Sequence, residues 1–278
     1  MINNLNILLP EIFLSLSIFT ILMLGVFIKK SFNIVFNLSL LILILTITII
    51  LNNPNNEEKI FLDSFIRDGF SNYFKILILI SSLFVLNSSK IFITENSLDK
   101  FEYPIIILLS ILGMFFMVSS NDLILFYLGL ELQSLSLYIL ASIDRDNLRS
   151  SEAGIKYFVL SALSSGLLLY GCSLLYGFTG STNFDFIANQ LDGENVGAVF
   201  AMVFILVGLA FKVSAVPFHM WTPDVYEGAP TSITNYFAVV PKVAGLALLI
   251  KFMHIPFSNI LIEWQTILIF ISIASMIL

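Results

Sequence analysis

The chain alternates between long apolar runs and short polar segments. A membrane-spanning helix needs roughly 20 mostly apolar residues, and a helix satisfies all its backbone hydrogen bonds within its own segment. Nine runs fit a helix of this kind: Ile7–Ile28, Phe32–Leu51, Tyr73–Asn87, Tyr103–Ser120, Leu123–Ile143, Gly154–Phe178, Ala198–Val216, Thr231–Met253 and Asn259–Leu278. The pattern therefore predicts an all-α polytopic membrane protein with nine transmembrane helices.

Two polar segments between these runs are not expected to cross the membrane. Residues 52–72 become amphipathic around Phe61 and Phe65, which predicts a segment at the membrane interface. Residues 180–197 contain no Lys or Arg, only the acidic residues Asp185, Asp192 and Glu194. We expect them to form an exposed loop.

The composition excludes an ordinary soluble domain. Of the 278 residues 58% are hydrophobic and 12% are charged, whereas soluble domains have about 45–50% apolar and about 25% charged residues. Lipid is therefore the expected environment. No basic cluster indicates nucleic acid, and the single cysteine, Cys172, cannot form an internal disulfide. The heavy use of Phe, Ile, Leu and Asn, with no signal or transit peptide, favours an organelle-encoded protein over a bacterial one.

Lys and Arg are distributed unevenly between the predicted loops. The loops after helices one, three and five contain Lys29, Lys30, Lys90, Lys100, Arg145 and Arg149. The opposite set contains mainly Lys59 and Arg67. Because basic loops stay on the cytoplasmic or matrix side, the N-terminus is expected on the other side, which is the intermembrane space for a mitochondrial protein.

Three ionisable residues lie well inside predicted spans, away from their ends: Glu131, Lys212 and Lys242. Each costs about 2.5–3.5 kcal/mol at the bilayer centre on insertion scales. We therefore expect them to face protein or water, and one another. A Glu131–Lys212 pair could change protonation as it opens and closes, or it could be a static ion pair that fixes helix packing. Both interpretations remain open.

Both lysines lie close to a proline. Pro217 follows Lys212 by five positions, and Pro241 directly precedes Lys242. A proline inside a helix removes the bond to the carbonyl four residues earlier, and such helix breaks recur at ion sites. The carbonyls freed in this way would be those of Val213 and Phe237.

Two further residues are weaker candidates for a proton path. Lys156 lies near the start of the sixth helix with Glu152 four residues before it, so it is either a helix-end pair or an inward relay residue. His219 could transfer protons at neutral pH or make a structural hydrogen bond. Glu11 is expected at the interface, and no cysteine, histidine or glycine motif indicates a metal, redox or nucleotide cofactor in this chain.

The strings NDLILFYLGLELQSLSLYILA, EAGIKYFVLSALSSGLLLYGCSLLYG and FKVSAVPFHMWTPDVYEGAPT resemble subunit 2 of respiratory complex I, the proton-pumping NADH:quinone oxidoreductase. The resemblance runs from about Pro10 to about Lys251. ELQSL and GCSLLYG bring it closer to the mitochondrial form than to the bacterial or chloroplast forms. The resemblance implies the mitochondrial inner membrane and an antiporter-like fold.

The resemblance implies roles for the buried residues. Glu131 and Lys212 would be the charge pair of a proton half-channel, Lys242 the central lysine, and Lys156 a further lysine of the same path, with His219 as a lesser member. It also implies three regions: helices one to three in residues 1–102 with the interfacial segment, a first five-helix repeat in 103–253, and the start of a second repeat in 254–278.

The same resemblance implies partners rather than cofactors for this chain. NADH, FMN, iron–sulfur clusters and ubiquinone would belong to other subunits of the complex, and the neighbours of this chain would be lipid and other membrane-arm subunits. The family has about fourteen helices, so we expect a second polypeptide to supply the rest, or else a truncated chain. A cation/proton antiporter subunit and a structural membrane-arm subunit that does not pump are the alternatives.

Overall fold

A computed structural model describes residues 6–28, 31–53, 57–191 and 196–278. Nine of the helices within these ranges are long and apolar enough to cross a membrane, which confirms the predicted fold class. They are α2 (Leu9–Phe27), α3 (Phe32–Asn52), α4 (Gly69–Glu95), α5 (Glu102–Ser119), α6 (Leu123–Ala141), α7 (Leu148–Thr179), α9 (Val196–Val213), α11 (Thr231–His254) and α12 (Leu261–Ile277), the last preceded by the 3-10 turn η1 (Ser258–Ile260).

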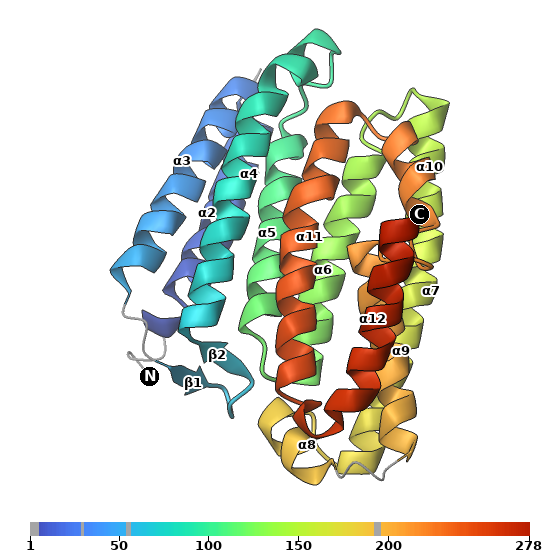
Figure 1. Cartoon of the computed structure of the whole chain (residues 1–278). Helices are drawn as coiled ribbons and strands as arrows, with labels where there is room; N and C mark the ends of the chain where they lie inside the picture. The colour runs from blue at the N-terminus through green and yellow to red at the C-terminus, as the bar shows by residue number, and fades with distance from the viewer. Residues whose placement is uncertain (1–5, 29–30, 54–56, 192–195) are drawn as a thin grey trace.

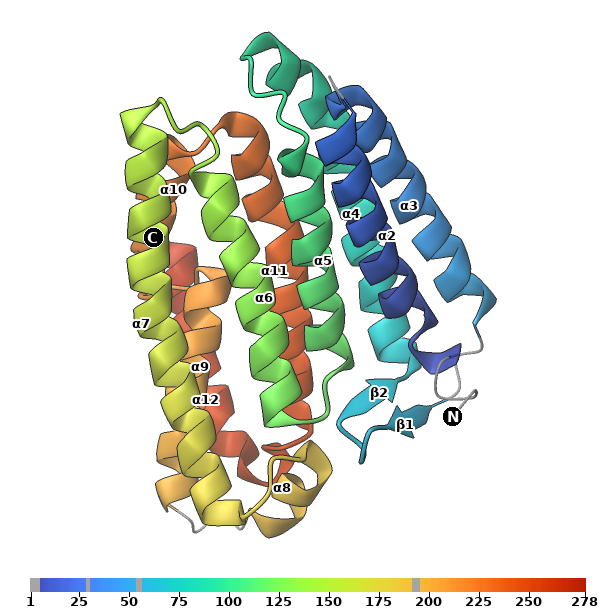
Figure 2. The same ribbon diagram turned by 180° about the vertical axis from the view of Figure 1, so that it is seen from behind.

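The helices form one elongated bundle (Figures 1 and 2). Helices α2, α3 and α4 lie along one side, α5, α6 and α11 occupy the centre, and α7, α9 and α12 lie along the other side. Most of α5 is buried, because it packs against α2, α3 and α4 as well as against its central neighbours α6 and α11. Most of α12 is exposed.

Helix α4 is longer than the sequence predicted. The expected span was Tyr73–Asn87, whereas the helix covers Gly69–Glu95. It begins in a capping box, in which the Asp68 carboxylate accepts a hydrogen bond from the backbone N–H of Ser71 and the Ser71 hydroxyl accepts one from the Asp68 N–H. Lys75, near the start of this helix, is buried and forms an ion pair with Glu11 of α2.

The segment expected at the interface contains a short antiparallel hairpin. Strand β1 (Glu58–Ile60) pairs with β2 (Phe65–Arg67), with Glu58 opposite Arg67. The two side chains form an ion pair of 2.7 Å across the strands. Residues 57–68 form no candidate span, whereas the last four residues of the segment begin α4. The strands themselves were not predicted.

The prediction of an exposed loop at 180–197 was wrong for its centre. Helix α8 (Phe184–Gln190) begins at Asn183, whose side chain caps the N–H groups of Asp185 and Phe186. Phe184 and Ile187 are fully buried, so the apolar residues of this polar segment anchor it to the bundle. Asp192 and Glu194, like Lys29 and Lys30 of the orientation argument, lie outside the described residues.

Helices α5 and α6 touch backbone to backbone through two glycines. A Cβ at Gly113 would lie 2.6 Å from the backbone nitrogen of Gln133, and one at Gly129 would lie 2.8 Å from that of Met117. Only glycine permits so close an approach. This contact fixes the position of α6, and therefore of Glu131, two residues after Gly129.

Helix α9 ends earlier than predicted, at Val213 rather than Val216. Ser214 adopts a left-handed conformation with φ 63°. The N–H groups of Ser214 and Ala215 then bond to the carbonyls of Phe211 and Ala210, at 3.1 and 2.9 Å. This is the Schellman closure of a helix. Pro217 therefore lies beyond the helix, in the connection to α10 (Trp221–Gly228), and not inside it as expected.

Candidate functional site

One face of α6 carries a line of polar side chains. Glu131, Ser134 and Tyr138 are spaced three and four residues apart, which places them on the same side of the helix. The Ser134 hydroxyl donates to the Leu130 carbonyl at 2.7 Å, so its oxygen can accept a hydrogen bond from another residue. This face of α6 therefore presents a hydrogen-bond acceptor to the neighbouring helices.

Lys212, in the last turn of α9, supplies that donor. Its Nζ lies 2.7 Å from the Ser134 Oγ on α6 and 2.6 Å from the Ser161 Oγ on α7. The Tyr138 hydroxyl also donates to Ser161, at 2.6 Å. Three helices thus meet in one hydroxyl cluster around a single amine, and the cluster stabilises that amine within the bundle.

The expected direct Glu131–Lys212 pair does not form. Among the described residues no carboxylate oxygen lies within ion-pair distance of the Lys212 Nζ. The Glu131 Oε1 is buried without a hydrogen-bond partner. The reason is geometric: Lys212 meets α6 one turn beyond Glu131. The two groups interact through space and lack only a short contact.

Lys242 lies in the middle of α11 and contacts the end of α9. Its Nζ donates to the Val213 carbonyl at 2.9 Å and to the Ser214 hydroxyl, and lies 5.0 Å from the centroid of the Trp221 ring. Val213 is the last residue of α9, so its carbonyl has no partner within the helix. The partial negative charge at a helix C-terminus favours a cation at this point.

The two lysines are joined by the end of α9 and by an aromatic layer. Trp221 stacks on Tyr157 with ring centroids 4.5 Å apart, and Tyr157 meets Tyr138 edge to face at 4.9 Å. The Trp221 indole N–H donates to the Phe211 carbonyl at 2.9 Å. These rings exclude lipid from the region between the lysines and hold the helix end in place.

The helix breaks were predicted in part. The sequence correctly placed the Val213 carbonyl near a lysine, although the carbonyl is free because α9 ends there. Pro241 does lie inside α11, which removes the bond to the Phe237 carbonyl. Lys242 directly follows Pro241, and its amine binds the carbonyl of α9.

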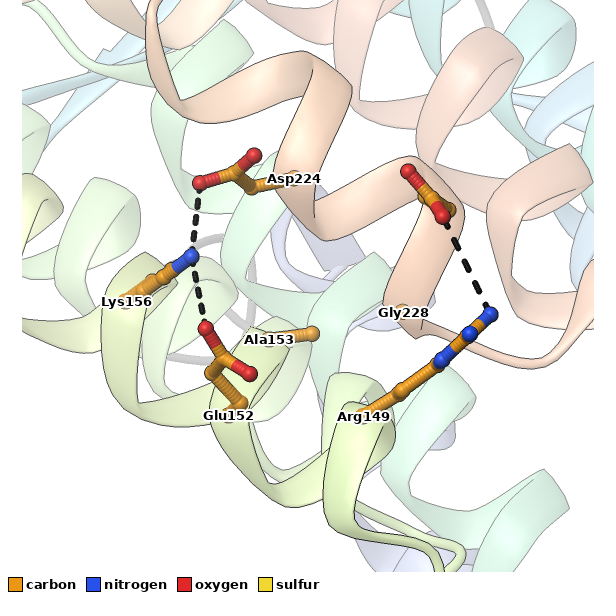
Figure 3. A pocket seen from close by; sticks show the side chains of 7 residues that line it. Arg149, Glu152, Ala153, Lys156, Asp224 and Gly228 are labelled. Carbon is orange, nitrogen blue, oxygen red and sulfur yellow. Dashed lines mark hydrogen bonds and ion pairs between the residues drawn. The ribbon is translucent and has the colours of Figure 1, made fainter.

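Lys156 is not part of the Lys212 cluster. It is partly exposed and forms ion pairs of 2.7 Å with Glu152 and 2.8 Å with Asp224 of α10 (Figure 3). These residues line a hollow of about 200 Å³ together with Arg149, which pairs with Glu227 at 3.9 Å. The helix-end pair with Glu152, one of the two alternatives, is present.

His219 lies half-buried in the connection before α10. Its Nδ1 is buried and has no partner among the described residues. Its backbone carbonyl accepts the N–H of Thr222 at 2.9 Å. Within the part of the chain that the structure describes, no hydrogen bond joins its ring to Lys212 or Lys242, so its role stays a prediction.

A second buried ionic group was missed by the sequence argument. Glu11 of α2 and Lys75 of α4 form an ion pair of 2.6 Å, and the two side chains are 2% and 1% exposed. Lys251 of α11 is also buried, and its Nζ donates to the Val118 carbonyl at 2.9 Å. Glu11 was expected at the interface; it is inside the protein.

Lys59, Asp185 and Asn121 form a polar clamp outside the spans, between the hairpin and α8. Lys59 of β1 pairs with Asp185 of α8 at 2.7 Å, and the Asn121 amide donates to Asp185 at 3.0 Å. The hydrogen bond to Asp185 raises the pKa of Lys59 above its ordinary value. Burial acts to raise the pKa of Asp185, but the hydrogen bonds from Lys59 and Asn121 outweigh it and hold that pKa below its ordinary value.

The described residues include no group of three or more His, Cys, Asp or Glu side chains that could hold a metal ion. The chemistry that the buried site can perform is proton transfer. Hydroxyl groups both accept and donate, and an amine carries a proton or releases it. Glu131, the hydroxyl cluster, Lys212 and Lys242 supply groups of both kinds in one connected region.

Residues 120–278 match the family model described as NADH:quinone oxidoreductase/Mrp antiporter, TM. This range contains Glu131, Lys212 and Lys242. The chain belongs to this family.

Individual relatives agree with the family assignment. The chain is 58% identical to NADH-quinone oxidoreductase subunit N of Pelagibacter ubique, over 99% of this chain and 59% of that protein. It is 52% identical to subunit N of Parvibaculum lavamentivorans, over 97% of this chain and 56% of that protein. In a structure of respiratory complex I from Thermus thermophilus with bound aureothin, one chain superimposes with a TM-score of 0.76 and 31% identity, over 87% of this chain and 52% of that one.

The chain spans somewhat more than half the length of these relatives. These relatives are bacterial, so they do not support the specifically mitochondrial type that the sequence suggested. The family match and the nine candidate spans among the described residues confirm the multi-pass membrane assignment.

The sequence contained a signal for some of the missed residues. Ser134 and Tyr138 share the helical face of Glu131, so their spacing alone could have joined them to the site. Ser161, Ser214 and Trp221 come from other elements, and only the packing of α7, α9 and α10 brings them to the lysines.

Proposed function

We propose that this chain belongs to a membrane-arm subunit of a proton-pumping NADH-quinone oxidoreductase and carries protons without performing redox chemistry. The observation that carries this proposal is the connected region of Glu131, Lys212 and Lys242 inside apolar helices, with both lysines held by hydroxyl and carbonyl oxygens. Membership of the family and the 58% identity to a subunit N support it.

The geometry suggests how a proton would move. In the arrangement described here the Lys212 amine lies on Ser134 and Ser161, one turn from the unpartnered Glu131 oxygen. A helical turn rises about 5.4 Å, a distance that a lysine side chain can cover by changing rotamers. Movement of the amine between the hydroxyls and Glu131 would open and close a charge pair, and would change the field at Lys242 beyond the end of α9.

The redox steps belong to other chains in this proposal. NADH, FMN, iron–sulfur clusters and ubiquinone would be bound by partner subunits, and this chain would contact other membrane-arm subunits and lipid. The membrane is an energy-converting one, either bacterial or mitochondrial. The bias of Lys and Arg supports an N-terminus on the side opposite the cytoplasm or matrix.

The test uses the complete complex carrying Lys212→Met or Glu131→Gln. We expect NADH oxidation by the assembled enzyme to be coupled to less proton pumping in both variants. The matched control is Lys90→Met. Lys90 lies on α4, far from the site in sequence, and donates a hydrogen bond to Asn37 of α3 instead of to a residue of the site. Normal pumping in assembled Lys212→Met enzyme would refute the role.

The same preparation separates the rival functions. A purified complex without flavin or iron–sulfur subunits would indicate a cation/proton antiporter instead. Loss of assembly in every variant, with no pumping defect in any complex that does assemble, would indicate a structural subunit.

A further inference from the structure

The buried ionic group at the hairpin end of the bundle has an unusual charge balance. Glu11 and Lys75 form an ion pair of 2.6 Å, and both side chains are almost completely buried. Apart from Lys75, neither carboxylate oxygen of Glu11 has a hydrogen-bond partner among the described residues. A buried carboxylate normally accepts several hydrogen bonds, so this one has free acceptor capacity.

Lys251 adds a second buried amine to the group. It is 4% exposed, and its Nζ donates to the Val118 carbonyl. No carboxylate within the described ranges lies within ion-pair distance of it, whereas Lys75 is near enough to act on it through space. The group therefore contains two buried amines, of which Lys75 contacts the Glu11 carboxylate and Lys251 interacts with Lys75 through space.

The aromatic surroundings favour a cation but add no anion. The Lys75 Nζ lies 5.3 Å from the ring centroid of Phe65 and 5.6 Å from that of Phe115. These ring faces stabilise an ammonium. The further charged groups that face the cluster lie toward the protein surface: Lys59 of β1, Asp68 at the start of α4 and Asp185 of α8, with Arg67 of β2 already paired to Glu58.

A hollow with a mainly apolar lining borders Glu11, whose carboxylate oxygens are buried beside it. It has a volume of about 250 Å³ and reaches from the exposed ring of Phe61 to Glu11, past Ser15 and Ser64. This is room for several water molecules. Glu11 therefore lies between a hollow on one side and two buried amines on the other.

We infer that Glu11, Lys75 and Lys251 form an internal proton-binding centre that exchanges protons with the hairpin side of the membrane. A proton that enters through the hollow converts the Glu11 carboxylate into a carboxylic acid. Lys75 then loses its ion-pair partner, and release of one proton from Lys75 or Lys251 restores the charge of the cluster. One proton enters and one leaves, with no oxidant or other reactant.

The centre is separate from the proposed Lys212 site. Glu11 and Lys75 precede residues 120–278, which match the family model, so they belong to helices outside that region. Lys251 lies nine residues after Lys242 on α11, about 13 Å along the helix axis. Proton binding at Glu11 does not depend on the chain being part of a NADH-quinone oxidoreductase.

Infrared difference spectroscopy of the intact native assembly, recorded over a pH titration, tests this inference. We expect a carboxylic acid carbonyl band that grows as the pH falls, that is lost in Glu11→Gln and that persists in the control Glu95→Gln, an exposed carboxylate at the end of α4. Lys251→Met should shift the midpoint of the band, because it removes one charge from the cluster.

A second variant guards against misfolding. Glu11→Gln/Lys75→Met removes both charges, and we expect it to fold and to lack the band. Identical spectra for the wild type and the double variant at every pH would overturn the inference and leave a static ion pair. An unchanged midpoint in Lys251→Met would exclude Lys251 from the centre. Neither result bears on pumping through Lys212.

Discussion

The Nζ of Lys212 lies 2.7 Å from the Oγ of Ser134, one helical turn beyond Glu131 on the same face of α6. The Ser134 hydroxyl donates its hydrogen bond to the Leu130 carbonyl, so its oxygen acts as an acceptor toward Lys212. The amine is therefore held next to its carboxylate but not on it. An arrangement of this kind can switch, whereas a closed ion pair inside a protein resists opening.

Ser134→Ala should remove one of the hydrogen bonds that position the Lys212 amine. A hydrogen bond to a charged group contributes about 1.5–3 kcal/mol, so the free energy of unfolding should fall by roughly that amount. If the bond also acts in the transfer step, proton pumping should slow by roughly tenfold, the rate equivalent of about 1.4 kcal/mol. Pumping by reconstituted enzyme and thermal unfolding measure the two effects.

Ser136→Ala is the matched control for this experiment. Ser136 lies on the same helix and is buried, but its hydroxyl donates to the Leu132 carbonyl of its own helix and not to a lysine. It should pump at the wild-type rate. Equal pumping by both alanine variants would show that Ser134 has no part in transfer.

Gly129→Ala should disturb the site through the backbone. The added Cβ would lie 2.8 Å from the backbone nitrogen of Met117 on α5, and a backbone atom cannot turn aside. Overpacking of this kind costs about 1–3 kcal/mol. Thermal unfolding should show this loss, and because Glu131 lies two residues further along α6, pumping should fall as well.

Gly166→Ala provides the comparison. Gly166 lies in α7, and no atom lies within 4 Å of a Cβ built there. Alanine is about 0.5–1 kcal/mol better than glycine inside a helix, so this variant should be unchanged or slightly more stable. Equal stability of the Gly129→Ala protein would mean that α5 and α6 can separate without cost.

The spans could be predicted because lipid imposes one simple requirement on sequence. Runs of apolar residues gave all nine helices, with ends that differ most at α4 and α7. The α4 prediction was short at both ends, and the ion-pair partner of its Lys75, Glu11, is 64 positions away in sequence. Tertiary pairing of this kind leaves no local signal.

The site was predicted as residues but not as contacts. Glu131, Lys212 and Lys242 stood out because charges in apolar helices are costly. Their actual partners are serine hydroxyls, a carbonyl and an aromatic ring, which are common in any membrane helix. The end of α9 depends on the left-handed conformation of Ser214, a residue type that gives little warning of it.

Glu11→Gln and Lys75→Met should each destabilise the protein more than the double variant does. Removal of one member of a buried ion pair costs about 3–5 kcal/mol, because the other charge stays buried without a partner. Removal of both charges leaves a neutral contact of similar size. Thermal unfolding of the four proteins measures the coupling. Additive losses would show that the pair makes no energetic contact.

The clamp between Lys59 and Asp185 should open in acid. The pKa of Asp185 is lower in the folded protein than its ordinary value. Its contribution to stability is therefore complete above the unfolded pKa, about 4, and is lost as the pH falls through the folded pKa. The pKa of Lys59 is raised, so its contribution is complete below about pH 10 and is lost only in stronger base.

Spin labels on the hairpin and on α8 measure this opening. Leu62 and Phe186 are exposed positions for cysteine labelling, and the native Cys172 is buried. The distribution of distances between the two labels should stay constant between about pH 5 and about pH 9 and should become broader below about pH 4. Asp185→Asn should broaden it already at neutral pH and remove the acid transition. A distance that does not change with acid, or with Asp185→Asn, would show that α8 is held by the burial of Phe184 alone.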